Sequence, residues 1–205
     1  MSALSYVAHY FVTVHGRQVD VPPLDRERWR AAGVRESEID RVAGFHERWG
    51  GLVLPPSLAY DGGPRWFAAD LPVGASGADR FDAGQTRSAL PYTFDIGPNG
   101  EFGLGCGRFA ALHESVEGWI ESLALAYYAA VEARKITVVD DVDLSGFEPV
   151  DEVRGVTDNW WRTETTLISV HGGLATYYDQ PEATFARVYE GIPTTGMLSP
   201  RASRS

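Results

Sequence analysis

The chain has 205 residues, a length typical of a single domain, and 44% of them are hydrophobic, which is enough to bury a core. Its net charge of −10 works against binding to nucleic acid or to anionic lipid, because both are polyanions. The same charge favours a basic partner. The single cysteine, Cys106, excludes a framework of internal disulfides.

Nothing in the sequence indicates export or membrane insertion. Residues 1–10 lack the basic and apolar regions of a signal peptide, and no stretch approaches the ~20 apolar residues that cross a bilayer. We expect a cytoplasmic protein that contacts neither a membrane nor nucleic acid directly. The oligomeric state cannot be derived from these features.

The first 22 residues predict a β-hairpin that packs on the core. Residues 6–14 are rich in β-branched and aromatic side chains, and residues 18–21 alternate between polar and apolar. His15 and Gly16 lie between the two runs as a turn, and Pro22 and Pro23 end the second strand.

Two helices are predicted next, over residues 24–32 and 36–49. The second is well defined, because its apolar residues recur at steps of three and four and two glycines follow it. Strands are then predicted over residues 66–69, 90–96, 101–104 and 108–111, with a surface loop over 72–85 and a tight Asn-Gly turn at 97–100.

A long amphipathic helix is predicted from Ser115 to Lys135. Ser115 is a suitable N-cap, and Arg134 with Lys135 suits the negative end of the helix dipole. One apolar stripe runs along about five turns. Its members are Val116, Trp119, Ile120, Leu123, Tyr127, Ala130 and Val131.

After this helix the sequence predicts a strand over 136–139, an acidic loop over 140–152 and three short strands over 167–170, 174–178 and 185–189. Hairpin turns between neighbouring strands favour an α+β fold with a mostly antiparallel sheet backed by helices. We expect a core over 23–139, a β extension of the same domain over 140–195 and a flexible tail over 196–205.

One candidate for chemistry is a nucleophile built from Cys106 with His113 as its base. No signature of a known cysteine enzyme surrounds either residue, and a cysteine between glycines is commonly a small buried side chain. An enzyme with a pocket assembled from distant residues, Asp82 among them, remains an alternative. No nucleotide-binding loop or zinc pattern is present, so we expect no cofactor and no bound metal.

The acidic loop offers a second alternative. Residues 141–152 place oxygen donors at positions 1, 3, 5 and 12 of a calcium loop, with Gly146 at position 6. However, Glu148 and Pro149 depart from the usual pattern, and a strand rather than a helix precedes the loop. A solvated acidic surface and a calcium-binding structural loop both remain open.

Two features could form a surface for a protein partner. The aspartates Asp140, Asp141 and Asp143 concentrate negative charge on one loop. The adjacent tryptophans Trp160 and Trp161 form either an exposed aromatic patch or one core residue beside one partly covered residue.

Three stretches in the central part of the chain, 47–56, 96–103 and 112–121, form a helix that ends in glycine before a Leu-Pro step, a strand–turn–strand unit and a capped helix with an early Trp119. Their order resembles the SUKH superfamily, which includes cell-wall-assembly regulators and bacterial immunity proteins. The resemblance covers residues 36–130, and the sequence departs from it at the N-terminal segment, at 60–64 and after Val139.

The resemblance implies a non-catalytic α+β protein that binds a protein partner. In an immunity protein that partner is a toxin, commonly a nuclease, and the acidic charge of this chain suits a basic one. We therefore expect a protein-binding module, with Asp140, Asp141, Asp143, Trp160 and Trp161 as candidate contacts and with no catalytic residue.

Overall fold

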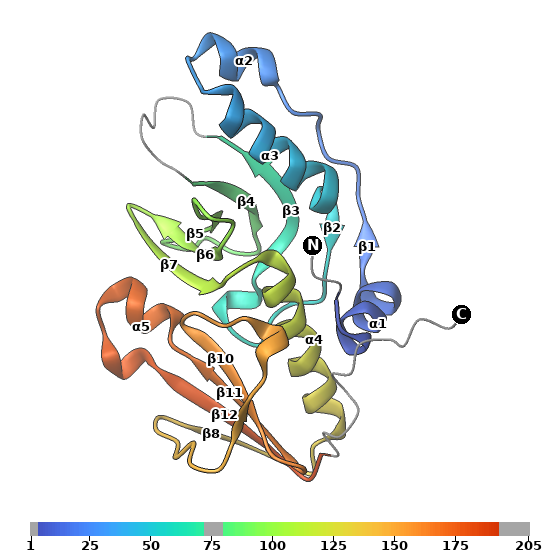
Figure 1. Cartoon of the computed structure of the whole chain (residues 1–205), viewed down its shortest axis with the longest axis vertical. Coiled ribbons are helices and arrows are strands. Elements are labelled where there is room, and N and C mark those ends of the chain that lie inside the picture. Colours follow the sequence, from blue (N-terminus) through green and yellow to red (C-terminus); the bar gives the residue numbers. More distant parts are fainter. Residues whose placement is uncertain (1–3, 72–79, 193–205) are drawn as a thin grey trace.

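The structure, a computed structural model, describes residues 4–71 and 80–192. Five α-helices and three antiparallel sheets make up this part of the chain, which confirms the α+β class (Figure 1). Two of the sheets have five strands each, and the third joins only β1 (Arg17–Gln18) to β2 (Leu52–Val53).

The first large sheet has the order β3-β4-β5-β6-β7, so each strand pairs with its neighbour in sequence. The turn predicted at residues 97–100 is confirmed, since the N–H of Gly100 donates to the carbonyl of Gly97 at 3.1 Å and Gly100 has a φ of 97°. The strands are β3 (Pro64–Asp70), β4 (Phe81–Thr86), β5 (Thr93–Ile96), β6 (Phe102–Cys106) and β7 (Arg108–His113).

The second large sheet has the order β8-β12-β11-β10-β9. Strands β8 and β9 are consecutive in sequence yet lie at opposite edges, so residues 140–147 run from one edge of the sheet to the other. The strands are β8 (Lys135–Val139), β9 (Glu148–Pro149), β10 (Asp158–Arg162), β11 (Thr166–His171) and β12 (Phe185–Glu190).

Helix α4 (Val116–Glu132) lies between the two large sheets and belongs to both cores (Figure 1). Ser115 caps it as predicted, because its hydroxyl accepts from the N–H of Gly118. The helix ends three residues earlier than predicted, since Lys135 already begins β8.

The predicted single stripe of α4 is wrong over its last turns. Trp119 packs in the first core, whereas Leu125 and Ala129 face the second core on another side of the helix. As a result Ala130 is exposed and Val131 is 79% exposed. One helix that serves two sheets needs two apolar faces, which a single periodic stripe does not describe.

The predicted N-terminal hairpin is also wrong. Residues Tyr6–His15 form helix α1, which packs on α4 and buries Phe11. Ser5 caps α1 by accepting from the N–H of Ala8, and its own hydroxyl donates to the buried Glu121 at 2.6 Å. The cap and the packing on α4 outweigh the β propensity of this run.

Three further predictions for strands and loops need correction. The predicted loop over 72–85 contains β4, while residues 72–79 lie outside the described part. The predicted strand over 174–178 is helix α5 (Gly173–Tyr178), and β10 was not predicted at all. The predicted tail, 196–205, also lies outside the description. Helices α2 (Arg26–Ala31) and α3 (Glu36–Trp49) agree with expectation, and α3 covers β3.

Candidate functional site

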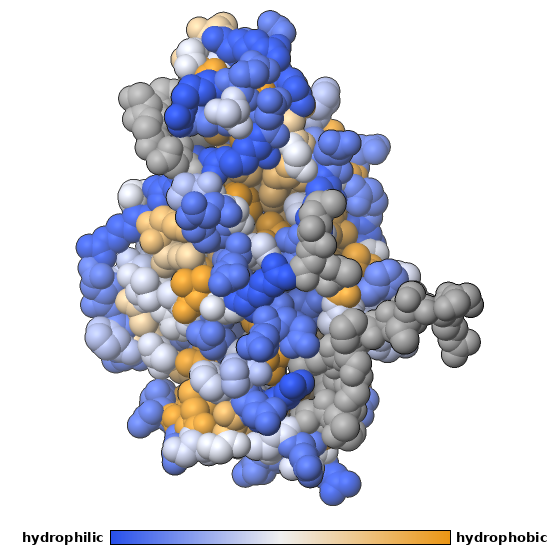
Figure 2. Space-filling model, in the orientation of Figure 1, coloured by the Kyte–Doolittle hydropathy of each residue, from blue (hydrophilic) through white to orange (hydrophobic). Residues whose placement is uncertain are grey.

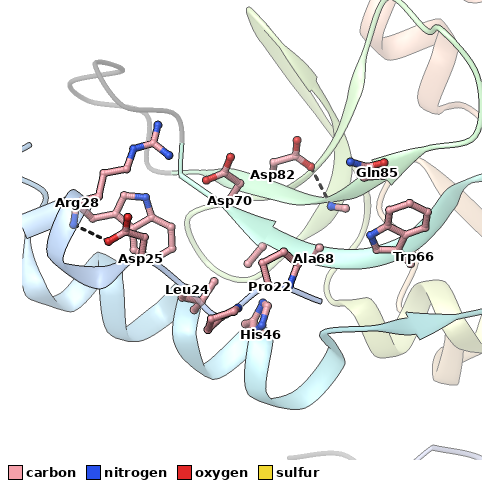
Figure 3. Close-up of a pocket in the computed structure, with 14 residues that line it drawn as sticks. Pro22, Leu24, Asp25, Arg28, His46, Trp66, Ala68, Asp70, Asp82 and Gln85 are labelled. Atoms are coloured by element: carbon pink, nitrogen blue, oxygen red, sulfur yellow. Dashed lines mark hydrogen bonds between the residues drawn. The ribbon is translucent and has the colours of Figure 1, made fainter. Parts of the chain in front are cut away.

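A groove of about 480 Å³ lies at the end of the molecule formed by α2, α3 and the edge strand β3. The chain segment 22–29 forms one wall, α3 contributes His46, and β3 with β4 forms the other wall (Figure 3). We call this the acidic groove, after the three aspartates Asp25, Asp70 and Asp82 that line it.

The two strands of the groove wall bring Asp70 and Asp82 together. The two residues are directly opposite each other in the β3–β4 pairing. Figure 3 shows both carboxylates pointing to the same side of the strand pair. Like charges directly opposite on a sheet are destabilising, so the fold tolerates a local cost here.

Asp82 is poorly supplied with hydrogen-bond donors for a carboxylate that is largely buried. Its only donor in the described part of the chain is the N–H of Gly84, at 2.9 Å. Burial, with smaller contributions from the charges of Asp95 and Asp70, raises the pKa of Asp82 to about 6. No arginine or lysine among the described residues forms an ion pair with Asp70 or Asp82.

The remaining walls combine aromatic surface with a few polar groups. Trp29 is buried, and Trp66 is partly exposed. Nδ1 of His46 is buried without a hydrogen-bond partner in the described residues. Asp25 is occupied by capping α2, because it accepts from the N–H of Arg28 at 2.9 Å. The guanidinium of Arg28 extends along the same wall (Figure 3).

This arrangement suits a cation rather than a reaction. Two carboxylates without cationic partners among the described residues face one opening, and Trp66 lines the same groove farther along β3; both kinds of group receive organic cations. Within the described residues, no three Asp, Glu, His or Cys side chains come together as a metal site.

The three aspartates expected to bind a partner are all exposed. Residues Asp140, Asp141 and Asp143 lie on the segment that crosses the second sheet, while the neighbouring Val142 and Leu144 are partly buried. We call this segment, residues 140–147, the crossing segment. The alternation directs its carboxylates to solvent and its apolar side chains toward the protein.

The strand register assigns the residues of the second sheet to its two faces. Trp160, opposite Ser169, lies on the face toward α4, so Ile168 lies on the other face. Ile168 is only 1% exposed and belongs to neither of the two cores that share α4. Figure 2 shows a largely hydrophilic face of the molecule, with hydrophobic residues gathered toward the lower end of the view.

The calcium-loop pattern over 141–152 gains no support from the geometry. The carboxylate of Asp143 accepts from the N–H of Ser145 at 2.8 Å in a local turn. Glu148 pairs with β10, and Glu152 lies in a separate 3₁₀ turn, η2 (Asp151–Val153).

The prediction of an exposed pair of tryptophans is wrong for Trp160. It is 2% exposed, its Nε1–H donates to the hydroxyl of Ser122 at 2.8 Å, and its ring stacks on Tyr189. Trp161 points to the other face and is partly buried opposite Ile168. Of the two tryptophans only Trp161 can contribute to a surface contact. This agrees with the second alternative from the sequence, one core tryptophan beside one that is partly covered.

Cys106 and His113 do not meet. Cys106 pairs with Arg108 at one end of the β6–β7 hairpin, and His113 pairs with Phe102 at the other end. The two residues are seven positions apart in sequence. Five of these positions run along β7, which places the two side chains roughly 15 Å or more apart. Burial lowers the pKa of His113 to about 4, so this side chain is a neutral core residue at pH 7.

A second polar cluster lies where η1 (Tyr60–Gly62) meets the second sheet. We call it the Asp158 network. The carboxylate of Asp158 accepts from the hydroxyl of Tyr60 at 2.5 Å, from Nδ1 of His171 at 3.1 Å and from the N–H groups of Gly172 and Gly173 at 3.1 Å each. These donors hold the pKa of Asp158 below its usual value, although burial works in the opposite direction.

The Asp158 network reproduces the hydrogen-bond order of an Asp–His–Ser triad, because Nε2 of His171 lies 3.2 Å from the hydroxyl of Ser169. However, Ser169 is 1% exposed, and the adjoining cavity has a volume of about 10 Å³. That is room for one water molecule and not for an acyl substrate. The network is a structural connection between the two halves of the fold.

Neither polar cluster was found from the sequence as a site. The sequence predicts Asp82 only as a possible member of a pocket assembled from residues that are distant in sequence, and it predicts no binding role for Asp70 or His46. The available signal was the alternation of Trp66, Ala68 and Asp70 along β3, which predicts one face outside the core. Their convergence with Asp82 depended on β4, which was predicted as loop.

Comparisons of the chain with protein-family models, with curated proteins and with solved structures found no match. Among the described residues, no helix is both long enough and apolar enough to cross a membrane.

Proposed function

We propose that this protein is a non-catalytic binding module of the cytoplasm that recognises a basic protein, in the manner of an immunity protein that neutralises a toxin. The observation that carries the proposal is the acidic groove. It presents Asp70 and Asp82 without cationic partners from the described residues, on a chain with a net charge of −10.

Electrostatics supports a partner of this kind. An acidic surface accelerates association with a basic protein and does so most strongly at low salt. The exposed carboxylates of the crossing segment, Asp140, Asp141 and Asp143, extend the negative surface to the other end of the molecule. We expect them to act on the association rate, and the groove to provide the close contacts.

The resemblance to the SUKH superfamily supports the same proposal from the sequence. It rests on residues 36–130, which in the structure comprise α3, the first sheet and most of α4. The groove lies in this region, between α3 and β3. The toxin partner, such as a basic nuclease, is part of the proposal and follows from the resemblance.

The test begins by cross-linking the tagged protein in its own cells and identifying what it captures. The captured protein is then purified, and its affinity is measured by calorimetry and its association rate by stopped-flow mixing, both at about 50 and 300 mM salt. Four proteins are compared: the wild type, Asp70→Asn in the groove, Asp141→Asn in the crossing segment, and Glu182→Gln as an exposed control elsewhere. Asp70 is exposed and makes no ion pair in the described structure, so its replacement should leave the fold intact.

We expect a basic partner whose binding weakens with salt. Asp70→Asn should weaken the affinity about tenfold, Asp141→Asn should mainly slow association, and Glu182→Gln should change neither. Co-expression should protect a host cell from the captured partner if that partner is a toxin. A partner that tolerates both aspartate variants and high salt would contradict the proposal.

A further inference from the structure

We infer that the acidic groove is a site for a guanidinium group, and that it receives one arginine side chain of the partner between the carboxylates of Asp70 and Asp82. This inference rests on the proposed function for the identity of the partner. The site itself follows from the groove and can be tested without any partner.

The first argument is geometric. Asp70 and Asp82 are paired across neighbouring strands, which places their Cβ atoms about 5 Å apart on one face. A guanidinium is a planar fork with five N–H donors, so it can bond two carboxylates at once. An ammonium concentrates its charge at one point and spans such a pair less well.

The second argument is the supply of hydrogen bonds. Asp82 has one donor, the N–H of Gly84, and its second carboxylate oxygen has none from the described residues. By contrast, a structural carboxylate in the same protein, Asp158, has four donors. A buried carboxylate that is left short of donors is costly unless a ligand provides them.

The third argument is the aromatic wall. Trp66 lines the same groove four positions from Asp70 along β3, opposite Gln85 (Figure 3), and offers aromatic surface to the part of the partner next to its arginine. The guanidinium of Arg65 lies 4.9 Å from the centre of the Trp66 ring, so one face of this ring is already occupied by a cation of the protein itself. Arg28 lines the facing wall.

The charged side chains that line the groove favour the binding of one cationic group. Three aspartates and one arginine line the groove, and one of the aspartates, Asp25, is engaged in capping α2. Arg28 carries the same charge as the proposed ligand and lies on the wall of the site. Replacing it with glutamine should therefore strengthen binding, which a site for an anion would not show.

The probe for the test is N-acetyl-arginine methylamide, titrated into the full chain and followed by NMR. The indole N–H signal of Trp66, assigned with Trp66→Phe, reports on the groove. The citrulline analogue is the matched control, because it has nearly the same shape without the charge. The lysine analogue and calcium chloride test the other two kinds of cation.

We expect the arginine probe to bind with a Kd on the order of 1 mM, as a single side chain in an open groove would. The citrulline analogue should bind at least tenfold more weakly, and the lysine analogue should lie between them. Asp82→Asn should weaken binding about tenfold, Arg28→Gln should strengthen it about twofold to threefold, and Glu182→Gln should leave it unchanged.

A second readout is pH. Several charged or titratable groups face Asp82 from the surrounding elements. Lowering the pH from 7.5 to 5 protonates its carboxylate, so the affinity for arginine should fall about fivefold to tenfold. Asp82→Asn should remove most of this pH dependence of the affinity. The variant thereby separates the effect of Asp82 from the effects of its neighbours Asp25, Arg28, His46, Asp70 and Asp95.

Three results would overturn the inference: equal binding of citrulline and arginine, a response confined to residues outside the groove, or binding of calcium without binding of arginine. The two proposals can fail separately. If the arginine probe binds in the groove but the protein partner tolerates Asp70→Asn, only the proposed function fails. If the partner needs Asp70 but the probe does not bind, only the guanidinium site fails.

Discussion

Asp82 and Asp158 are both largely buried carboxylates, and the protein treats them in opposite ways. Asp158 accepts from Tyr60, His171 and two backbone N–H groups, and its pKa is lowered. Asp82 accepts from one backbone N–H, and its pKa is raised to about 6. A carboxylate that the fold fully satisfies stabilises the fold. A carboxylate left incompletely satisfied is available to a ligand, and its cost to stability is evidence for such a role.

The largest effect should come from removing the satisfied carboxylate. Asp158→Ala leaves Tyr60, His171 and two buried N–H groups without their acceptor, so we expect the free energy of unfolding to fall by about 3–5 kcal/mol. Urea denaturation measures it, with Asp20→Ala as an exposed control. A loss below about 1 kcal/mol would show that the network does not hold the second sheet in place.

The next effect is a pH dependence from His113. Its pKa of about 4 in the folded protein lies below the usual value of 6.5, so the unfolded chain binds more protons between these values. The contribution of His113 to the stability should therefore fall by about 2 kcal/mol as the pH drops from 7 to 5. Asp82 contributes with the opposite sign, because its raised pKa favours the folded state at low pH.

Single variants separate these two contributions. In a His113→Gln protein the carboxyl groups whose pKa is raised by burial, Asp82, Asp95 and Glu121, remain, so the stability should rise rather than fall when the pH is lowered from 7 to 5. Chemical denaturation at the two pH values checks this. If the variant and the wild type lose the same stability on acidification, His113 is not the group responsible.

A smaller effect tests one donor of the Asp158 network. Tyr60→Phe removes the hydroxyl that donates to Asp158 and keeps the ring beside Trp119. We expect a loss of about 1–2 kcal/mol, because three donors to the carboxylate remain. Tyr178→Phe, on an exposed side chain, is the matched control. A loss as large as that of Asp158→Ala would mean that Tyr60 alone carries the connection.

The sequence was most informative where local signals and packing agree. The apolar periodicity of α3 and the cap at Ser115 predicted two helices close to their observed starts. The sequence was misleading over residues 6–14, where β-branched and aromatic side chains predicted a strand. There the Ser5 cap and the contact with Glu121 on α4 decide in favour of a helix, and a contact over 116 positions has no local signature.

The candidate site could be predicted only in part, for a related reason. Exposed aspartates such as Asp141 can be recognised from a run of charge, and the structure does expose them. The acidic groove needs the register that places Asp70 opposite Asp82, and the strand that carries Asp82 was predicted as loop. Burial of Trp160 was equally a matter of sheet register, which one sequence does not specify.

The most direct test of the account is a pair of measurements on Asp82→Asn at pH 7. Removing a partly buried carboxylate that has a single backbone donor should raise the free energy of unfolding, by about 1 kcal/mol after allowance for its exposure to solvent. The same variant should weaken binding of the arginine probe about tenfold. A more stable protein that binds poorly is the result we predict. A variant that is less stable, or one that binds arginine as well as the wild type, would contradict the assignment of the groove as a binding site.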